Sequence, residues 1–330
     1  MFFSIIIPLY NRPQEIAELL GSLTRQTYSP FEVLVIEDGS TLDARQIVEG
    51  YKDRLNVHYY VKPNAGQGFA RNFGFERASG DYFIIFDSDC LVPADYLTKV
   101  AAFLKTTWLD AYGGPDAAHE TFTDIQQAIS YAMTSPFTTG GIRGNRRHVG
   151  QFHPRSFNMG VSRKAWEQVG GFKLTRLGED IEYSIRIQLS GFRIGLIPDA
   201  VVYHKRRTDF RQFYKQLHFF GRARINIYKH FRGELKLVHF FPAAFVLFLI
   251  ALALVNLWKT MVDVAAVGQL AWVGNGLLCG YLVLLFIHAW ARTKHIKVAL
   301  LGVIASVIQL CAYGLGFMQD FFKRVVLKHG

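Results

Sequence analysis

The chain has 330 residues, of which 50% are hydrophobic, and its formal net charge is +11. This length allows one large domain and an appendage. Much of the basic excess lies between Arg143 and Arg232, directly before an apolar C-terminal part. That placement favours an anionic lipid surface or a phosphorylated substrate, and we expect no nucleic-acid partner. The 3 cysteines make no disulfide framework and fit a reducing compartment.

The first 113 residues alternate short β-rich runs with helical patterns, which is typical of a parallel α/β sheet. The N-terminal run is apolar but has no basic start, so it indicates a buried strand and not a signal peptide. The continuous Ile, Val and Phe content of the runs predicts burial on both faces of the sheet. The expected strands are Phe3–Pro8, Phe31–Ile36, Val57–Val61 and Tyr82–Phe86, and the expected helices are Pro13–Thr24, Leu42–Tyr51 and Gly68–Ala78.

Residues 114–160 are mixed in pattern and contain a basic, Gly-rich loop from Gly140 to Gly150. Regular patterns then return and extend the α/β region. We expect strands at Phe157–Ser162, Arg193–Ile197 and Ala200–His204, and helices at Arg163–Val169 and Ile181–Leu189.

Aromatic and basic residues interleave from Phe210 to Phe231. Phe213, Leu217 and Phe220 share one face of a predicted helix, while the basic residues lie elsewhere on it. This pattern is typical of a helix that lies in the plane of a membrane surface. An ordinary amphipathic helix on a protein core has the same pattern, so both interpretations stay open.

Three apolar stretches follow, at Val238–Trp258, Val264–Trp290 and Val298–Met318. Each reaches the length of about 20 residues that a bilayer requires, and Trp at two ends suits the membrane interface. The loop Ala291–Lys297 is basic, which predicts a cytoplasmic position for it and for residues 1–237. The basic C-terminal tail conflicts with this if the third stretch spans fully. We therefore leave open two or three spans, with the third stretch re-entrant or interfacial in the first case.

Acidic clusters follow two of the predicted strands, and ligands of open α/β sheets bind at the carboxyl ends of strands. Glu37 and Asp38 would accept hydrogen bonds from a base or ribose, although a helix cap is the plainer interpretation. Asp87 and Asp89 follow a very apolar strand, where buried charges need a partner. Their oxygens suit Mg²⁺ or Mn²⁺, which bridge a diphosphate, although a turn with an Asp cap would look the same.

A third acidic cluster, Glu179, Asp180 and Glu182, lies at the start of a predicted helix. Acidic side chains there also complement the helix dipole. Asp180 is placed to take a proton from a substrate hydroxyl, whereas Glu182 is expected to pair with Arg186 four residues on.

His204 follows a predicted strand and precedes three basic residues, Lys205, Arg206 and Arg207. A single His is usually structural. Beside cations that suit phosphate, a metal-ligand role is an equal alternative.

These motifs, in this order, resemble the family 2 inverting glycosyltransferases of the GT-A fold. The resemblance covers residues 3–207. Its first acidic motif has Glu37 where the family usually has Asp. The matching segments are Ser4–Arg12, Glu37–Thr41, Asn64–Asn72, the DXD element Asp87-Ser88-Asp89, Asn158–Gly160, Gly170–Phe172 and Gly178–Asp180.

The resemblance implies a role for each candidate site residue. Asp180 would be the catalytic base, with Glu179 beside it. The cofactor would be Mg²⁺ or Mn²⁺. The nucleotide-binding residues would be Pro8, Tyr10, Asp38, Arg71 and Asp87, and the metal ligands Asp89, Asp87 and His204.

The implied fold class is α/β, a GT-A catalytic domain with a Rossmann-like, mostly parallel central sheet, followed by an all-α membrane region. The domains would be a GT-A glycosyltransferase domain at 1–207, an amphipathic interfacial helix region at 208–236 and a transmembrane region at 237–330. The protein would be a multi-pass protein of the inner, cytoplasmic membrane, with its catalytic domain in the cytoplasm.

The predicted function is metal-dependent, inverting transfer of a sugar from a nucleotide-diphosphate sugar, with UDP favoured, to a hydroxyl of a glycan or lipid-linked acceptor. Membrane lipids are expected partners, and the oligomeric state is left open. The basic segment Gly140–Arg155 is a candidate acceptor lid.

Four other classes of protein are alternatives to this function. A polyprenyl-phosphate sugar transferase remains an alternative, because a membrane anchor suits it equally. A non-catalytic, nucleotide-binding membrane scaffold is opposed by the retention of Asp38, Asp87, Asp89 and Asp180 together. A processive polysaccharide synthase would carry a Gln-x-x-Arg-Trp element, which is absent between Asp180 and Val238. A nucleotidyltransferase would carry a Gly-rich phosphate loop after the first strand, where Tyr10-Asn11-Arg12-Pro13 stands.

Overall fold

The computed structural model describes residues 1–117, 122–139, 152–205, 207–262 and 264–328. Backbone contacts divide the chain into two compact units. The first comprises Met1–His119 and Arg146–Lys205, and the second Glu120–Asn145 and Arg206–Gly330. The domain boundaries expected at residues 207 and 236 stay predictions, because a compact unit is not by itself a functional domain. The predicted loop Gly140–Gly150 lies outside the described residues.

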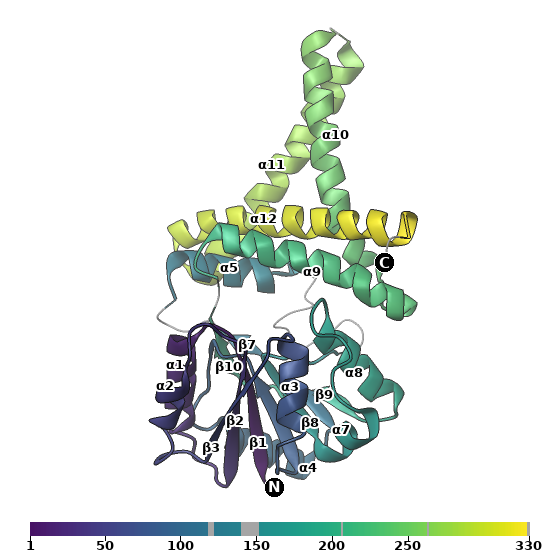
Figure 1. The fold of residues 1–330 in the computed structure, drawn as a ribbon. Coiled ribbons are helices and arrows are strands. Elements are labelled where there is room, and N and C mark those ends of the chain that lie inside the picture. Colours follow the sequence, from purple (N-terminus) through teal and green to yellow (C-terminus); the bar gives the residue numbers. More distant parts are fainter. Residues whose placement is uncertain (118–121, 140–151, 206, 263, 329–330) are drawn as a thin grey trace. The chain divides into compact units, whose positions relative to one another are not determined.

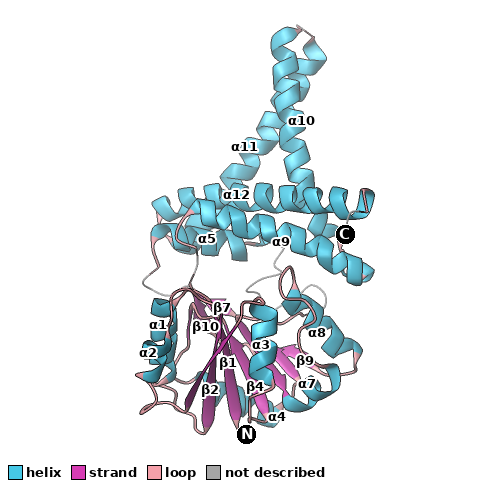
Figure 2. Cartoon of the chain, viewed as in Figure 1, coloured by secondary structure: helices cyan, strands magenta, loops and turns pink. Residues whose placement is uncertain are grey.

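The first unit contains an α/β sheet with helices on its faces (Figures 1 and 2). Its strands are β1 (Phe3–Leu9), β2 (Phe31–Asp38), β3 (Val57–Lys62), β4 (Tyr82–Phe86), β5 (Cys90–Leu91), β6 (Ala111–Gly113), β7 (Asp116–Ala117), β8 (Asn158–Ser162), β9 (Ile194–Leu196) and β10 (Val202–His204). Its helices are α1 (Pro13–Leu23), α2 (Arg45–Glu49), α3 (Gln67–Phe75), α4 (Tyr96–Thr106), α7 (Arg163–Val169) and α8 (Glu179–Leu189).

The main sheet has the strand order β3-β2-β1-β4-β8-β6-β9. The strands β1 to β4 are parallel to one another, with Ile5 beside Val33 on one side and Ile84 on the other. Strand β8 runs antiparallel between β4 and β6. The predicted α/β class with a mostly parallel sheet is therefore confirmed, and one antiparallel strand is added to it.

The sheet is buried on both faces, as its apolar runs predict. Ile5 and Ile7 of β1 lie in one apolar cluster, with α1 and α4, and Ile6 lies in another, with α3 and α7. Both clusters are fully shielded from water at these positions. Burial of this kind stabilises the folded sheet by about 25 cal/mol for each Å² of apolar surface removed from water. It therefore holds the central strands β1, β2 and β4 firmly in place.

A second, small sheet of order β5-β10-β7 lies beside the main sheet. Its pairing is antiparallel between β10 and β5, and this places His204 opposite Cys90. His204, near the C-terminal end of the first unit, therefore lies beside Cys90 in the segment that follows β4.

The second unit is helical. Its helices are α5 (Asp124–Thr134), α6 (Pro136–Thr139), α9 (Phe210–His230), α10 (Phe241–Met261), α11 (Ala265–Thr293) and α12 (Ile296–Asp320), with 3₁₀ turns at Arg232–Glu234 and Leu237–Phe240 and a π-helical turn at Phe321–Val326. Within the described residues, three segments are long and apolar enough to cross a membrane, by length and composition: Leu237–Met261, Ala265–Thr293 and Ile296–Val326. The three predicted apolar stretches are thus confirmed as helices.

Candidate active site

The candidate site lies where the parallel strands β1, β2 and β4 end. Asp38 is the last residue of β2, and Asp87 and Asp89 follow β4 directly. Parallel strands bring their carboxyl ends to one edge of a sheet, so these acids meet the residues that lead into α1, α3 and α8.

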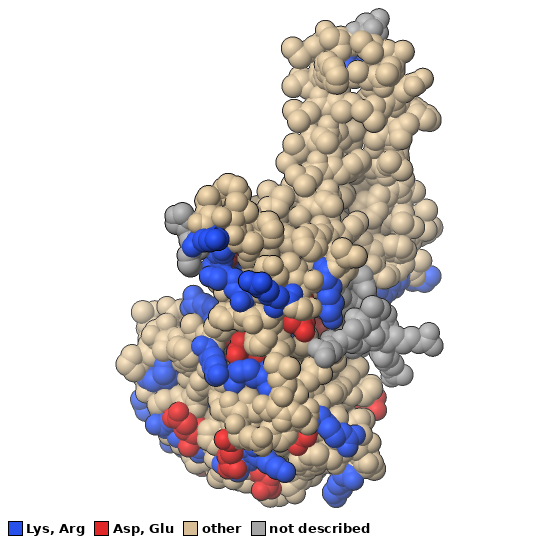
Figure 3. Space-filling model, turned by 90° about the vertical axis from the view of Figure 1, so that its right-hand side faces the viewer, with Lys and Arg blue, Asp and Glu red and all other residues tan. Residues whose placement is uncertain are grey.

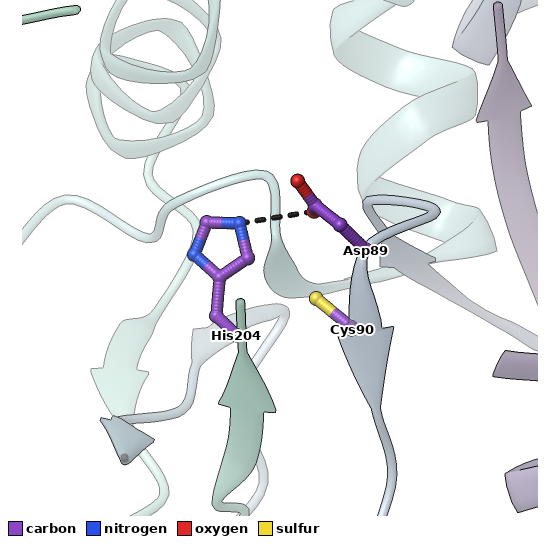
Figure 4. A group of neighbouring side chains, drawn as sticks. All are labelled: Asp89, Cys90 and His204. Carbon is purple, nitrogen blue, oxygen red and sulfur yellow. Dashed lines mark hydrogen bonds and ion pairs between the residues drawn. The ribbon is translucent and has the colours of Figure 1, made fainter. Parts of the chain in front are cut away.

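Asp89 pairs with two side chains from distant parts of the chain. Its Oδ2 lies 2.5 Å from Nη1 of Arg12, and its Oδ1 lies 3.1 Å from Nε2 of His204 (Figure 4). Burial by itself would raise the pKa of this carboxyl, but the charges and hydrogen bonds of His204 and Arg12 hold the pKa well below its usual value. Asp89 is therefore ionised at neutral pH and available to a cation.

Asp89, Cys90 and His204 form a cluster whose candidate ligand atoms all lie within 4.8 Å of one another. Figure 4 shows the three side chains converging from β10 and from the segment after β4. Burial raises the pKa of the Cys90 thiol, and its Sγ lies 3.5 Å from the carbonyl oxygen of Phe157. Beside the thiol, the cluster offers a carboxylate oxygen and an imidazole nitrogen as donors. This set fits Mn²⁺ or Mg²⁺ better than a thiolate-preferring metal.

His204 is held rigidly in this cluster. Its ring stacks on Phe157 with the centroids 4.9 Å apart and the planes 6° from parallel. Nδ1 is buried and has no hydrogen-bond partner among the residues that the structure describes, and Asp89 contacts the ring through the other nitrogen. The hypothesis that His204 is a ligand thus has a geometry that suits it.

Arg71 connects the acids after β4 with those of α8. The side chain is fully buried, and its guanidinium lies 2.8 Å from Asp87 and 3.3 Å from Glu179. It also packs over the ring of Phe172, at 5.4 Å from the ring centroid. Gln67 donates a further hydrogen bond to Glu179. One buried cation therefore joins two of the three acidic motifs.

The loops around α3 approach each other too closely for ordinary side chains. Gly66 has a φ of +90°, and a side chain at Gly68 would collide with the carbonyl oxygen of Leu174. Thr175 donates a hydrogen bond of 2.8 Å to the carbonyl of Ala65. Glycine at these positions lets the start of α3 lie against the loop that leads to α8.

Glu179 and Asp180 differ in environment although they are neighbours. Glu179 is buried, and desolvation together with the charge of Asp180 raises its pKa, against the opposing effect of Arg71. Asp180 is 15% exposed, and its Oδ2 lies 3.7 Å from Arg155. Gly178, in the left-handed region at a φ of +92°, starts α8 just before the pair. Of the two carboxylates, that of Asp180 is the more exposed.

Asp38 holds the loop before α3. Its carboxylate accepts hydrogen bonds from the backbone N–H groups of Ala65 and Gly66, at 3.0 and 2.8 Å, and lies 2.5 Å from Nζ of Lys62. Pro8 lies in β1 and Tyr10 follows that strand, with 49% of Tyr10 exposed. These residues lie at the same sheet edge as the other acids.

The loops after β1 and β2 are tied together by Asn11. Its Oδ1 accepts hydrogen bonds from the N–H groups of Thr41 and Leu42, at 2.8 and 3.0 Å. Asn11 has a φ of +52°, which Asn tolerates better than most residues. This contact explains why Tyr10 and Asp38 share one edge.

The sequence prediction missed three residues of this site. Arg12, Gln67 and Arg155 pair with Asp89, Glu179 and Asp180 respectively. Arg12 and Gln67 lie within the segments that matched the family pattern, which is a usable signal. The predicted pair of Glu182 with Arg186 is confirmed at 2.5 Å, although Glu182 is buried and not on the helix surface.

The family model of glycosyl transferase family 2 matches residues 4–170, about half of the chain. The chain belongs to glycosyl transferase family 2. The prediction of this family and of a glycosyltransferase enzyme class is confirmed at the level of the family. The matched span includes β1, β2, β4 and the acids that follow them.

Relatives in this family include TarS, the poly(ribitol-phosphate) β-N-acetylglucosaminyltransferase of Staphylococcus aureus strain Mu50. It is 39% identical over 108 residues, which are 32% of this chain and 19% of TarS, so this family 2 chain matches only about a fifth of that relative. Glycosyltransferase AglE of Haloferax volcanii is 26% identical over 244 residues, which are 72% of this chain and 77% of AglE.

Among solved structures, the mannosyltransferase PcManGT from Pyrobaculum calidifontis in complex with GDP-Man and Mn²⁺ has a TM-score of 0.63. It is 18% identical and covers 93% of this family 2 chain and 86% of its own. At this identity the likeness shows the fold, and it confirms the predicted GT-A architecture.

Proposed function

We propose that the protein transfers a sugar from a nucleotide-diphosphate sugar to a hydroxyl of a glycan or lipid-linked acceptor, with inversion at the anomeric carbon. The observation that carries this proposal is the junction made by Arg71. It links Asp87, at the end of β4, to Glu179, at the start of α8. The diphosphate of the donor and the carboxylate that takes the proton of the acceptor hydroxyl would thereby be held at one edge of the sheet.

The donor would lie over the ends of β1, β2 and β4. Pro8, Tyr10 and Asp38 would line the base pocket, since their loops are held together there by Asn11. Arg71 would fix the position of Asp87 toward the ribose or metal. UDP is the favoured nucleotide, and the GDP-Man bound in PcManGT makes GDP the next to test.

A divalent cation, Mg²⁺ or Mn²⁺, would be held by Asp89 and His204 and would neutralise the charge that grows on the leaving nucleoside diphosphate. Asp87, two residues before Asp89, would be a further ligand. The Mn²⁺ in the PcManGT complex supports this choice of metal. The chain's own contribution is to keep Asp89 ionised and the His204 ring fixed against Phe157.

Asp180 would act as the base. Its carboxylate would take the proton of the acceptor hydroxyl, whose oxygen forms a bond to the anomeric carbon. The bond from that carbon to the diphosphate oxygen breaks on the opposite face, and the nucleoside diphosphate leaves with the electron pair. Glu179, paired with Arg71 and Gln67, would position the start of α8 and not take the proton itself.

The chain would work at the cytoplasmic face of the inner membrane. Helices α10 and α11 are apolar enough to cross a bilayer, and the turn between α11 and α12 is basic, with Lys294 in the link and Lys297 in the first turn of α12. Basic links of this kind stay in the cytoplasm, which would place the catalytic unit there as well.

The experiment is a donor screen on the full chain in detergent micelles. Thermal unfolding would be measured with UDP-, GDP- and dTDP-sugars, each with and without Mn²⁺, and the best donor would then be given to membrane lipid extracts. Mass analysis of the lipid products should show one added sugar on a hydroxyl. If the sugar is instead found on a polyprenyl phosphate, the acceptor is a phosphate and not a hydroxyl. If none of the donors raises the unfolding temperature, the proposed function is overturned.

A further inference from the structure

Helix α12 resembles α10 and α11 in composition but not in packing. It has no charged residue between Lys297 and Asp320. Half of its most apolar stretch is buried inside the chain, compared with 33% for the stretch that contains α10 and 11% for α11. A helix that faces lipid all round would not be covered in this way, so the packing of α12 needs another explanation.

Two polar helices cover α12 along one side. At its start, Lys297 lies 2.7 Å from Asp124 of α5. At its end, Asp320 lies 3.0 Å from Arg222 of α9. Between them, Ala305 and Ala312 of α12 pack in one cluster with apolar residues of α5 and α9. Figure 1 shows α5 and α9 running along α12 on the side away from the α10–α11 hairpin.

Helices α9 and α12 run in the same direction and lie close together. A side chain at Gly221 would collide with the carbonyl of Tyr313, and one at Gly316 would collide with the carbonyl of His218. Arg324 lies 3.1 Å from Asn226 further along the same pair. The two helices are therefore closely packed against each other, and a position for α12 in a membrane has to place α9 beside it.

This coupling makes a membrane-spanning α12 costly. Helix α9 carries Arg211, Lys215, Arg222, Arg224 and Lys229. Each Lys or Arg at the centre of a bilayer costs about 3 kcal/mol on insertion scales. Helices α10 and α11 carry only Lys259 and Arg292, each near a helix end, and their surface is almost free of charged side chains in Figure 3.

The side of α12 that α5 and α9 leave uncovered carries an exposed apolar stripe. Leu300, Ile304 and Leu315 are 54%, 48% and 40% exposed. Their spacing of 4 and 11 residues returns to one face of an α-helix. Phe322, in the π-helical turn that follows α12, is 58% exposed. The stripe is continuous with the hairpin, because α10 begins against Gly314 and Ala289 of α11 packs near Gly302. The chemistry that fits a stripe joined to two apolar spans is the acyl region of a lipid bilayer.

We infer that α12 lies in the plane of the membrane, with its apolar stripe on the acyl chains and α5 and α9 toward the headgroups, so that only α10 and α11 span. This inference rests on the membrane anchoring in the proposed function. It places the C-terminus on the same side as the catalytic unit, and it accounts for the basic tail that a third span would carry across.

Native cysteines allow a direct depth measurement. Cys279 lies at the middle of α11, and Cys311 lies at the middle of α12. Two variants would be made, one without Cys279 and one without Cys311, and the cysteine that remains of this pair would be labelled with a bimane. Its fluorescence would then be measured in phosphatidylethanolamine–phosphatidylglycerol vesicles that contain lipids brominated at known depths, which quench it. We expect Cys279 at the bilayer centre and Cys311 at the shallow depth shared by labels at Leu300→Cys and Phe322→Cys.

The outcomes separate the inference from the anchoring. If Cys311 is as deep as Cys279, α12 spans and the inference is overturned, while the anchoring stands. If neither label is quenched, the proposed anchoring itself fails.

A second measurement uses an impermeant maleimide on Lys294→Cys, Lys328→Cys and Met261→Cys. The first two should react from one side and the third from the other, whereas reaction of positions 328 and 261 from the same side contradicts the inference.

Discussion

Nη1 of Arg12 lies 2.5 Å from Oδ2 of Asp89, so a guanidinium occupies one oxygen of the carboxylate proposed to bind the metal. His204 contacts the other oxygen of the same group. A divalent cation at Asp89 would therefore compete with Arg12 for the carboxylate. The positive charge of Arg12 compensates that of Asp89 in this structure.

Replacing Arg12 should strengthen metal binding. In Arg12→Met the competing charge is lost, and a partly exposed ion pair contributes on the order of 1 kcal/mol, which corresponds to roughly 3- to 10-fold in the dissociation constant for Mn²⁺. Isothermal titration of the full chain in micelles measures it. Arg25→Met, at an exposed position of the same segment, is the matched control and should leave the affinity unchanged. Weaker binding by Arg12→Met would show that Arg12 supports the site.

His204 and Cys90 should differ in their effect on the metal. Loss of a second-shell partner already costs about 10- to 100-fold in metal affinity, so His204→Ala should weaken Mn²⁺ binding at least ~10-fold. Cys90→Ser should change it less, because the Asp89 carboxylate and the His204 imidazole are the donors proposed for the metal. Mn²⁺ titration of both variants compares them directly. A large loss in Cys90→Ser would make the thiol a ligand and favour a softer metal.

Arg71 should matter for stability as well as for activity. Arg71→Met leaves Glu179 buried without its cation, and breaking a buried pair from one side costs about 3–5 kcal/mol. Thermal unfolding in micelles should show a clear fall in Tm. The double variant Arg71→Met with Glu179→Gln removes the unpaired charge and should recover part of the loss. Additive losses would mean that the two side chains do not depend on each other.

Glu32 should make the first unit sensitive to acid. Burial would raise its pKa, but hydrogen bonds from Ser4 and Ser79 lower it below the ordinary value of 4.5. The folded chain then binds fewer protons at this group than the unfolded chain. Its stabilisation is therefore full above the unfolded pKa and is lost as the pH falls through the folded pKa.

The test compares melting between about pH 7 and pH 4. Glu32→Gln should be less stable than the wild type at neutral pH and should lose less further stability on acidification. Glu49→Gln, at an exposed position of α2, should behave as the wild type does. An unchanged acid dependence in Glu32→Gln would remove Glu32 as its source.

Much of the fold could be predicted because the strands are apolar throughout. Strand β4 begins and ends where its pattern predicts, and β2 extends two residues further, to Asp38. The antiparallel direction of β8 could not be predicted, since a buried run has no direction of its own. Helix α5 was missed although Thr123 and Gln126 form a capping box before it, which is a readable signal.

The site was predictable in its acids and not in its cations. Asp87 and Asp180 stand out because they follow a strand and start a helix. Arg71 pairs with Asp87 at a sequence separation of 16 residues and with Glu179 at 108, and no local pattern encodes such partners. Topology creates these pairs, so only the folded chain shows which cation belongs to which acid.

Asp180→Asn tests the central claim most directly. The substitution keeps the shape of the side chain but removes the base, so sugar transfer should fall by about 100- to 10,000-fold. Stabilisation by the donor with Mn²⁺ should persist, and Asp53→Asn, an exposed change of the same kind, should retain transfer. Full transfer by Asp180→Asn, measured as labelled sugar incorporated into the acceptor, would contradict the assignment of the base and the mechanism built on it.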